Sequence, residues 1–129
     1  MEIGKRNTFR RRERLKKYRD ILQVLRKGEN RSDDLLNIRL IQNFRDCSRL
    51  AVMTPKKLGI AVKRNRWRRM VREAFRLLKS SLKWNIDLVV RPLVPPEKIK
   101  TPEVEKRLRH AIRDYLRPFE GSEERRRKA

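Results

Sequence analysis

The sequence is poor in the residues that build metal centres and disulfide frameworks. Its 129 residues include one cysteine, Cys47, and one histidine, His110, so neither an internal disulfide nor a zinc ligand cluster is available. It has no apolar run of about 18 residues, which excludes a membrane span, and residues 1–20 lack the apolar segment of a signal peptide. These absences predict a reduced, cytoplasmic protein without structural metal.

Acidic residues are scarce as well. The chain has 38 Lys and Arg against 16 Asp and Glu, a formal net charge of +22. Such an excess repels itself unless a polyanion surrounds it, and nucleic acid fits because each neutralised phosphate releases counterions. An anionic membrane surface is the competing partner, which would favour a basic amphipathic helix with exposed Trp or Phe. The composition favours nucleic acid over a membrane.

The few acids are spread singly along the chain. Their closest pairs are Asp33–Asp34 and Glu123–Glu124, whereas a metal-dependent nuclease needs several carboxylates around two ions. His110 has no implied carboxylate partner, and Cys47 is predicted to be an incidental loop thiol. The sequence therefore assigns no catalytic residue and no metal ligand to this chain, and a self-sufficient nuclease is the poorest of the candidate functions.

Apolar periodicity predicts three helices and three strands. A first helix spans 12–27 and ends at Gly28 as its C-cap. Strand patterns occur at 35–44, at 50–54 before Pro55, and at 85–92. A last helix runs from the N-cap Thr101 to Pro118. This order predicts one α+β domain over 11–118, between a basic tail at 1–10 and a basic flexible tail at 119–129.

The central helix has the clearest pattern. Apolar residues recur at helical spacing from Trp67 to Leu78, and the positions between 63 and 76 hold seven basic residues against Glu73 alone. One face of this helix must enter the core, with Trp67 and Phe75 inside it, while the other presents arginines. The spacing places four of them opposite the apolar stripe: Arg64, Arg68, Arg72 and Arg76.

Two other interpretations of this helix stay open. The arginine face could be merely solvated, with Glu73 pairing to Arg69 and Arg76. Asn65 could cap the helix rather than contact a ligand. Gly59, just before the helix, is predicted to serve a backbone turn.

Residues 56–76 carry many fixed offsets in a short span. They follow the pattern Lys-Lys-x-Gly-x-Ala-Val-x-Arg-Asn and continue into a helix with Arg-Arg-x-x-Arg-x-x-Phe. This segment closely resembles the signature of the bacterial ribonuclease P protein subunit, and a weaker similarity covers roughly residues 10–116. The matching positions are Lys56, Lys57, Gly59, Ala61, Val62, Arg64, Asn65, Arg69, Arg72, Glu73 and Phe75, with Arg68 where Lys is usual.

The resemblance implies a fold that periodicity alone does not give. Members of this family form a compact sandwich of three helices on a small mixed sheet, similar to domain 2 of ribosomal protein S5. Their arginine-rich helix lies in a left-handed β-α-β crossover, whereas right-handed crossovers dominate in general.

The resemblance also implies a function in tRNA 5′ maturation. The protein is expected to be the non-catalytic subunit of an endoribonuclease whose catalytic RNA removes the 5′ leader of precursor tRNA. Mg²⁺ would be bound mainly by the RNA, with one protein per RNA. The alternative is a structural ribosomal or RNA-chaperone protein with no processing role.

Two sets of site residues follow from the resemblance. Contacts to the catalytic RNA are expected from Lys56, Lys57, Arg64, Asn65, Arg66, Arg68, Arg69, Arg72 and Arg76, because arginine can grip phosphate with two hydrogen bonds. A cleft for the precursor leader is expected at Lys16, Ile21, Leu25 and Arg39.

The cleft departs from the family pattern. Ile21, Leu25 and Arg39 stand where aromatic residues are usual, and only Arg39 can stack a planar group on a base. The basic residue expected after the third strand corresponds to Arg91, two positions early, a shift that preserves the strand face.

Overall fold

Two apolar clusters, one on each face of a small sheet, organise the fold. The computed structural model describes the backbone of residues 9–128 and the side chains of residues 9–120. The helices are α1 (Tyr18–Lys27), α2 (Ala61–Leu78) and α3 (Thr101–Lys128), and the strands are β1 (Glu29–Asn30), β2 (Leu36–Gln42), β3 (Arg49–Val52) and β4 (Ile86–Pro92). Short 3-10 turns occur at η2 (Arg11–Glu13), η3 (Lys56–Leu58) and η4 (Lys79–Ser81).

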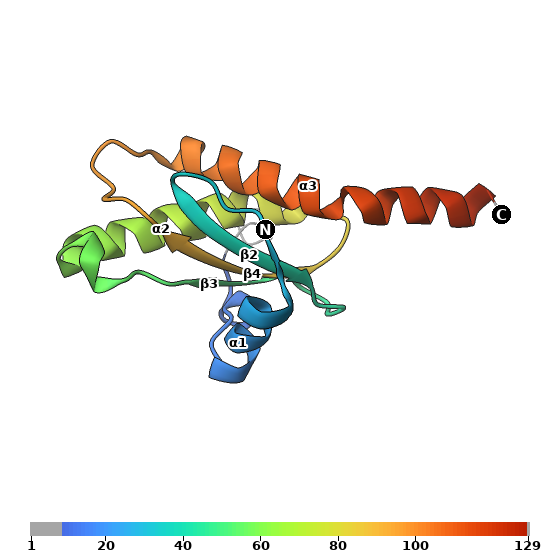
Figure 1. The fold of residues 1–129 in the computed structure, drawn as a ribbon, viewed down its shortest axis with the longest axis horizontal. Coiled ribbons are helices and arrows are strands. Elements are labelled where there is room, and N and C mark those ends of the chain that lie inside the picture. Colours follow the sequence, from blue (N-terminus) through green and yellow to red (C-terminus); the bar gives the residue numbers. More distant parts are fainter. Residues whose placement is uncertain (1–8, 129) are drawn as a thin grey trace, which may run out of the picture.

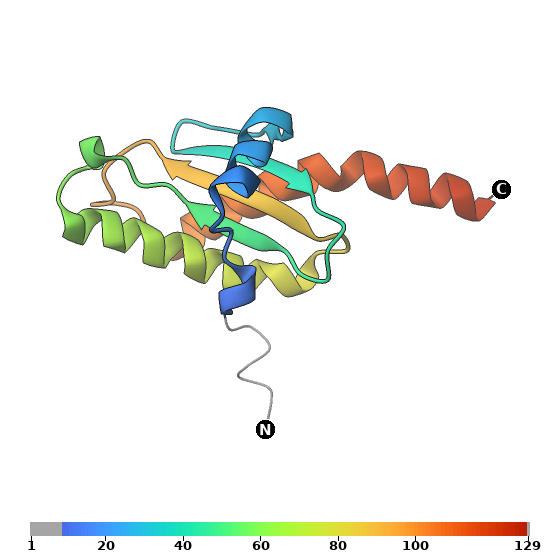
Figure 2. The same ribbon diagram turned by 90° about the horizontal axis from the view of Figure 1, so that it is seen from below.

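The sheet is mixed, with the strand order β1-β2-β4-β3. β2 pairs antiparallel with β1 and β4, and β3 pairs parallel with β4. Seen from the side of α1 (Figure 2), β3 and β4 both run from right to left, and the chain steps upward from β3 to β4. α2 appears below β3 in that view and lies on the face of the sheet opposite α1 (Figure 1). This β3-α2-β4 connection is a left-handed crossover, as the family resemblance implied.

The two faces of the sheet are covered unequally. α2 and α3 pack on one face and α1 on the other (Figure 1). Alternation along β2 sends Leu36, Ile38 and Leu40 into the larger cluster with α2 and α3. The smaller cluster lies under α1 and contains Leu15, Val24, Ala51 and Val89. The predicted α+β sandwich of three helices on a small mixed sheet is confirmed.

The first predicted helix is wrong over residues 12–17. Residues 11–13 form the η2 turn, the chain is then extended, and α1 begins only at Tyr18. The backbone N–H of Leu15 donates to the carbonyl oxygen of Leu50 at 2.8 Å, so this residue joins the edge of the sheet. Leu15 is buried either way, and helical spacing of apolar residues therefore did not distinguish the two conformations.

Gly28 ends α1 as predicted, but not by the left-handed backbone expected of a C-cap glycine. Its backbone is extended (φ −72°, ψ 159°) and its N–H donates to the carbonyl oxygen of Val24. Glycine is needed for space, because a Cβ here would lie 2.4 Å from the carbonyl oxygen of Val24 and 3.0 Å from that of Leu40.

Gly28→Ala is therefore expected to destabilise the protein by about 2–3 kcal/mol, since both obstructing atoms are backbone and cannot move aside cheaply. Urea unfolding followed by circular dichroism measures this. Gln23→Ala, at an exposed position of α1, is the control and is expected to change stability by less than about 0.5 kcal/mol. A Gly28→Ala variant as stable as that control would contradict the close approach.

The last helix does not end at Pro118. α3 continues to Lys128 with Pro118 inside it, and Phe119 packs edge-on against Trp84 and Tyr115. A proline inside a helix removes one N–H donor and crowds the preceding turn, so Pro118 was expected to end the helix, but the backbone continues past it. The two-residue strand β1 is too short for any sequence pattern to indicate. Most of the predicted N-terminal tail, residues 1–8, lies outside the described residues.

Candidate nucleic-acid interface

α2 presents the basic face that the sequence predicts. Its apolar side buries Trp67, Met70, Val71, Ala74, Phe75 and Leu78. The indole Nε1 of Trp67 donates to the carbonyl oxygen of Val94 at 2.8 Å, which confirms that this tryptophan belongs to the core. Lys56 and Lys57 are exposed on η3, immediately before the helix. Gly59 joins η3 to α2 with a φ of 116°, a conformation that favours glycine, so its turn role is confirmed.

The row predicted to face directly away from the core lies instead at its border. These four residues are half-buried, while a more exposed row lies one position further round the helix. The reason is that the N-terminal segment approaches this side, where Phe9 packs edge-on against Phe75 at 5.8 Å between ring centroids. The half-buried row is Arg64, Arg68, Arg72 and Arg76, and the exposed residues are Asn65, Arg66, Arg69 and Glu73.

Asn65 does not cap α2. The N-cap position is Ile60, which offers no side-chain acceptor, and Asn65 lies inside the helix. Its Oδ1 accepts a hydrogen bond of 2.7 Å from Arg68 Nη1, so Asn65 orients a guanidinium on the exposed surface. The capping interpretation is wrong.

Most of the cations on this face have no carboxylate partner. Lys63 pairs with Glu97 at 2.5 Å, and Arg76 Nε donates to Glu73 at 2.9 Å. Burial, and then the charges of Arg14 and Arg68, lower the pKa of Arg72, although an arginine stays protonated at neutral pH. Five arginines of α2 make no ion pair with any of residues 9–120: Arg64, Arg66, Arg68, Arg69 and Arg72. We call these five residues the arginine strip; no carboxylate of residues 9–120 neutralises its positive charge.

A shallow groove of about 690 Å³ runs beside this strip. The ring of Phe9 lies under two guanidinium groups, those of Arg14 at 5.5 Å and Arg72 at 5.9 Å. Arg66, Arg69 and Arg76 also line the groove. Sequence reasoning did not place Phe9 or Arg14 at this face, because only the tertiary structure brings them to α2.

The four predicted cleft residues lie on or beside the other face of the sheet. Ile21 and Leu25 of α1 are half-buried and pack against the small cluster, so part of their surface holds the helix on the sheet. Arg39 is half-buried on β2 opposite Val89, and Lys16 is exposed just before α1. Arg91 is exposed two residues beyond Val89, on the same strand face.

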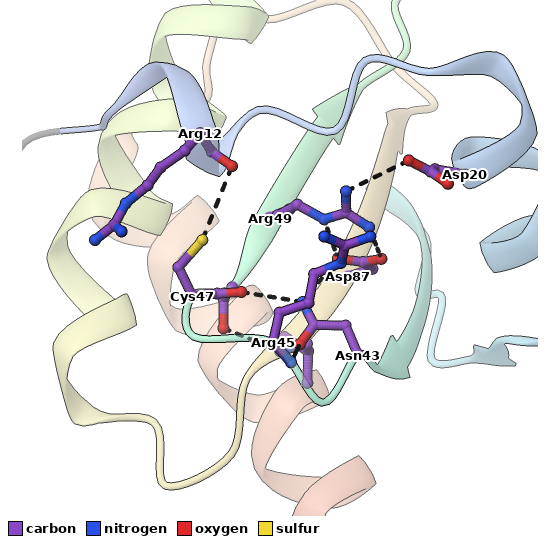
Figure 3. Close-up of polar contacts among 9 residues, drawn as sticks. Arg12, Asp20, Asn43, Arg45, Cys47, Arg49 and Asp87 are labelled. Carbon is purple, nitrogen blue, oxygen red and sulfur yellow. Dashed lines mark hydrogen bonds and ion pairs between the residues drawn. The ribbon is translucent and has the colours of Figure 1, made fainter.

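An ion-pair network fixes α1 over this face (Figure 3). Arg49 donates to both carboxylate oxygens of Asp87, at 2.8 and 2.6 Å, and reaches Asp20 of α1 at 3.4 Å. The hydrogen bonds to Asp87 raise the pKa of Arg49. Asn43 Nδ2 also donates to Asp87 at 2.8 Å. These partners explain why Asp87, a carboxylate, can be only 6% exposed. Its burial needs no catalytic role as an explanation.

Most acids of residues 9–120 contact basic side chains in the same way. No group of three or more His, Cys, Asp or Glu in residues 9–120 could hold a metal ion. The two acids of the closest pair, Asp33 and Asp34, both contact Arg107, at 3.0 and 2.7 Å. None of the helices in the described part of the chain combines the length and the hydrophobicity that a membrane span requires.

Comparison with known proteins shows the family. The profile of the Ribonuclease P family matches residues 9–116. The ribonuclease P protein component of Thermotoga petrophila is 38% identical over 85 residues, which cover 66% of this chain and 73% of the relative. The structure of the Staphylococcus aureus RNase P protein superposes with a TM-score of 0.69 and 29% identity, over 80% of this chain and 94% of that one. The Thermotoga maritima RNase P protein superposes with a TM-score of 0.67 and 30% identity, over 76% of this chain and 93% of that one.

The fold, three helices on a four-stranded mixed sheet, is that of a class of small α+β proteins that includes the solved RNase P proteins. The match over most of its length makes the assignment specific: the chain belongs to the ribonuclease P protein family. A ribonuclease P protein component is a subunit of an endoribonuclease and has an RNA partner.

Proposed function

We propose that this chain binds the catalytic RNA of ribonuclease P through α2 and the 5′ leader of precursor tRNA through the face between α1 and the sheet. In this way it assists the Mg²⁺-dependent removal of the leader by the RNA. The Mg²⁺ ions are held mainly by RNA, one protein serves one RNA, and the particle acts in the cytoplasm.

The observation that carries the proposal is the unpaired arginine strip of α2. Five guanidinium groups without carboxylate partners on one rigid helix repel one another. The phosphodiester backbone of RNA would relieve this repulsion. Arg66, Arg68 and Arg69 project donors suited to phosphate oxygens. Lys56 and Lys57 extend the same surface as point charges.

The leader face supports a weaker contribution. Ile21 and Leu25 are partly covered by their packing against the sheet. The groups able to stack on a base or to pair with a phosphate of a single strand are therefore Arg39 and Arg91. Lys16 adds a flexible charge at the entrance. Leader affinity in this protein therefore rests on cations more than on aromatic stacking.

The experiment is precursor processing by the cognate ribonuclease P RNA at magnesium concentrations too low for the RNA alone. Adding the purified chain is expected to restore cleavage at the mature 5′ end, because neutralised phosphates lower the cation demand of the folded RNA. RNA binding without any gain in cleavage would favour the structural or chaperone alternative. Protein purified free of RNA is the control and is expected to cleave nothing.

A further inference from the structure

The loop between β2 and β3 exposes a phenylalanine in an unfavourable backbone conformation. Phe44 is 86% exposed, and its φ of 55° makes it the one non-glycine residue with a positive φ among residues 9–128. A bulky side chain rarely adopts the left-handed region, and exposing its ring to water is itself unfavourable. Neither the strained backbone nor the exposed ring stabilises the packing of the domain.

Hydrogen bonds on both sides of Phe44 hold the loop in this shape (Figure 3). Asn43 Nδ2 donates to the carbonyl oxygen of Cys47 at 3.1 Å and to Asp87 at 2.8 Å. Asn43 Oδ1 accepts from the N–H of Arg45 at 2.9 Å. The carbonyl oxygen of Arg45 in turn accepts from Asn85 Nδ2 at 2.7 Å. Strained residues persist where the surroundings fix them, and they gather at functional sites.

The loop that carries this ring lies beside several cations. Arg45 is exposed and makes no ion pair within residues 9–120. The thiol of Cys47 donates to the carbonyl oxygen of Arg12 at 3.8 Å, which brings the basic turn η2 beside the loop. Three acids lie near the loop: Asp46 contacts Arg12 at 3.5 Å, and Asp87 and Glu13 are paired with Arg49 and Lys79. Burial raises the pKa of the Cys47 thiol, so the loop carries a neutral thiol among these charges.

We propose that Phe44 is a stacking platform for an unpaired base of RNA, with Arg45 and the η2 arginines holding the adjoining phosphates. The inference rests on the proposed function, because it assumes an RNA partner, and it adds a contact that lies outside both the α2 strip and the leader face. An aromatic ring flanked by arginines suits a single-stranded segment. A second copy of this chain is a poor occupant, because two bodies of charge +22 repel each other.

The test compares three substitutions for binding to the cognate ribonuclease P RNA. Phe44→Asn removes the ring and suits the left-handed backbone, so it is expected to raise Tm slightly while weakening RNA binding on the order of tenfold. Phe44→Leu keeps an apolar side chain without a π face and is expected to weaken binding equally. Phe44→Trp is expected to retain the binding of the unaltered chain, and RNA is expected to quench the fluorescence of the added tryptophan.

The outcomes separate this inference from the function beneath it. If the unaltered chain does not bind the RNA, the proposed function fails. If it binds and Phe44→Asn binds equally well, the stacking role is overturned while the function stands. Retained binding by Phe44→Leu likewise overturns stacking, as does RNA that quenches the Phe44→Trp variant no more than the unaltered chain. An unchanged or raised Tm in Phe44→Asn shows that a loss of binding is not a loss of folding.

Discussion

Replacing Arg66, Arg69 and Arg72 together by glutamine is expected to weaken binding of the ribonuclease P RNA on the order of a hundredfold. These three side chains make no ion pair in the part of the chain that the structure describes, so their removal leaves no carboxylate stranded. If each lost contact contributes about 1 kcal/mol, the sum reaches that factor. The slope of log affinity against log salt is also expected to fall by about 2–3.

The salt slope separates a local contact from an effect of total charge. The variant with Lys106, Arg113 and Arg117 replaced by glutamine removes the same three charges from exposed positions of α3. Filter binding over a salt series is expected to leave its slope nearly unchanged. Equal slopes for the two triple variants would show that RNA does not lie along α2. Circular dichroism confirms that both fold.

Arg64 is left out of this set for a structural reason. Its Nε is buried and has no hydrogen-bond partner among the described residues, so a substitution there would change packing as well as charge. Arg66 and Arg69 are exposed, and Arg72 lies over the ring of Phe9 but leaves no buried polar atom without a partner. The sequence placed Arg64 in the outermost row, and a binding experiment designed from that row would confuse the two effects.

The sequence determined α2 well because every signal for it is local. Trp67 to Leu78 repeat at helical spacing, and the offsets of residues 56–76 lie in one short segment. The groove beside α2 is different. Phe9 and Arg14 lie on either side of the η2 turn, and Arg14 pairs with Leu50 of β3. Nothing in their own sequence neighbourhood indicates that both reach Arg72 or α2.

The loop at Phe44 is a further feature that the sequence could not predict. Phe44 is an ordinary residue in sequence, between two strands, and its exposure depends on how Asn43 bonds to Asp87, 44 residues away. Hydrogen bonds of this kind override local preference and are invisible to periodicity. Gly28 is a second case, because its need for space comes from Leu40 of the neighbouring strand. Sequence patterns gave the elements, and tertiary contacts decide which side chains become available.

Glu13→Ala is expected to cost about 3–5 kcal/mol of folding free energy, a large part of the stability of a small domain. Glu13 and Lys79 form a buried pair, with Nζ 2.7 and 2.6 Å from the two carboxylate oxygens and side chains only 8% and 9% exposed. Glu13 also accepts the backbone N–H of Arg10 at 2.6 Å. Its removal leaves an ammonium and an N–H group without this acceptor.

A double-mutant cycle in urea checks this assignment. Replacing both residues, Glu13→Leu with Lys79→Met, is expected to recover most of the loss, because no buried charge is then left behind. Asp46→Ala breaks the exposed Arg12–Asp46 pair, 58% and 83% exposed, and is expected to cost less than about 1 kcal/mol. A Glu13→Ala variant as stable as Asp46→Ala would mean that the pair does not anchor the N-terminal segment.

The double variant also connects stability with RNA binding. Glu13 lies between Phe9 and Arg14, the two residues that reach the strip beside Arg72, and Lys79 follows the end of α2 directly. An apolar pair can keep the domain folded, but it does not fix the direction of the segment as two oxygens on one ammonium do. We therefore expect Glu13→Leu with Lys79→Met to fold and yet to bind the RNA several-fold more weakly than the unaltered chain. Binding equal to that of the unaltered chain, at matched stability, would show that the groove beside α2 needs no such anchor.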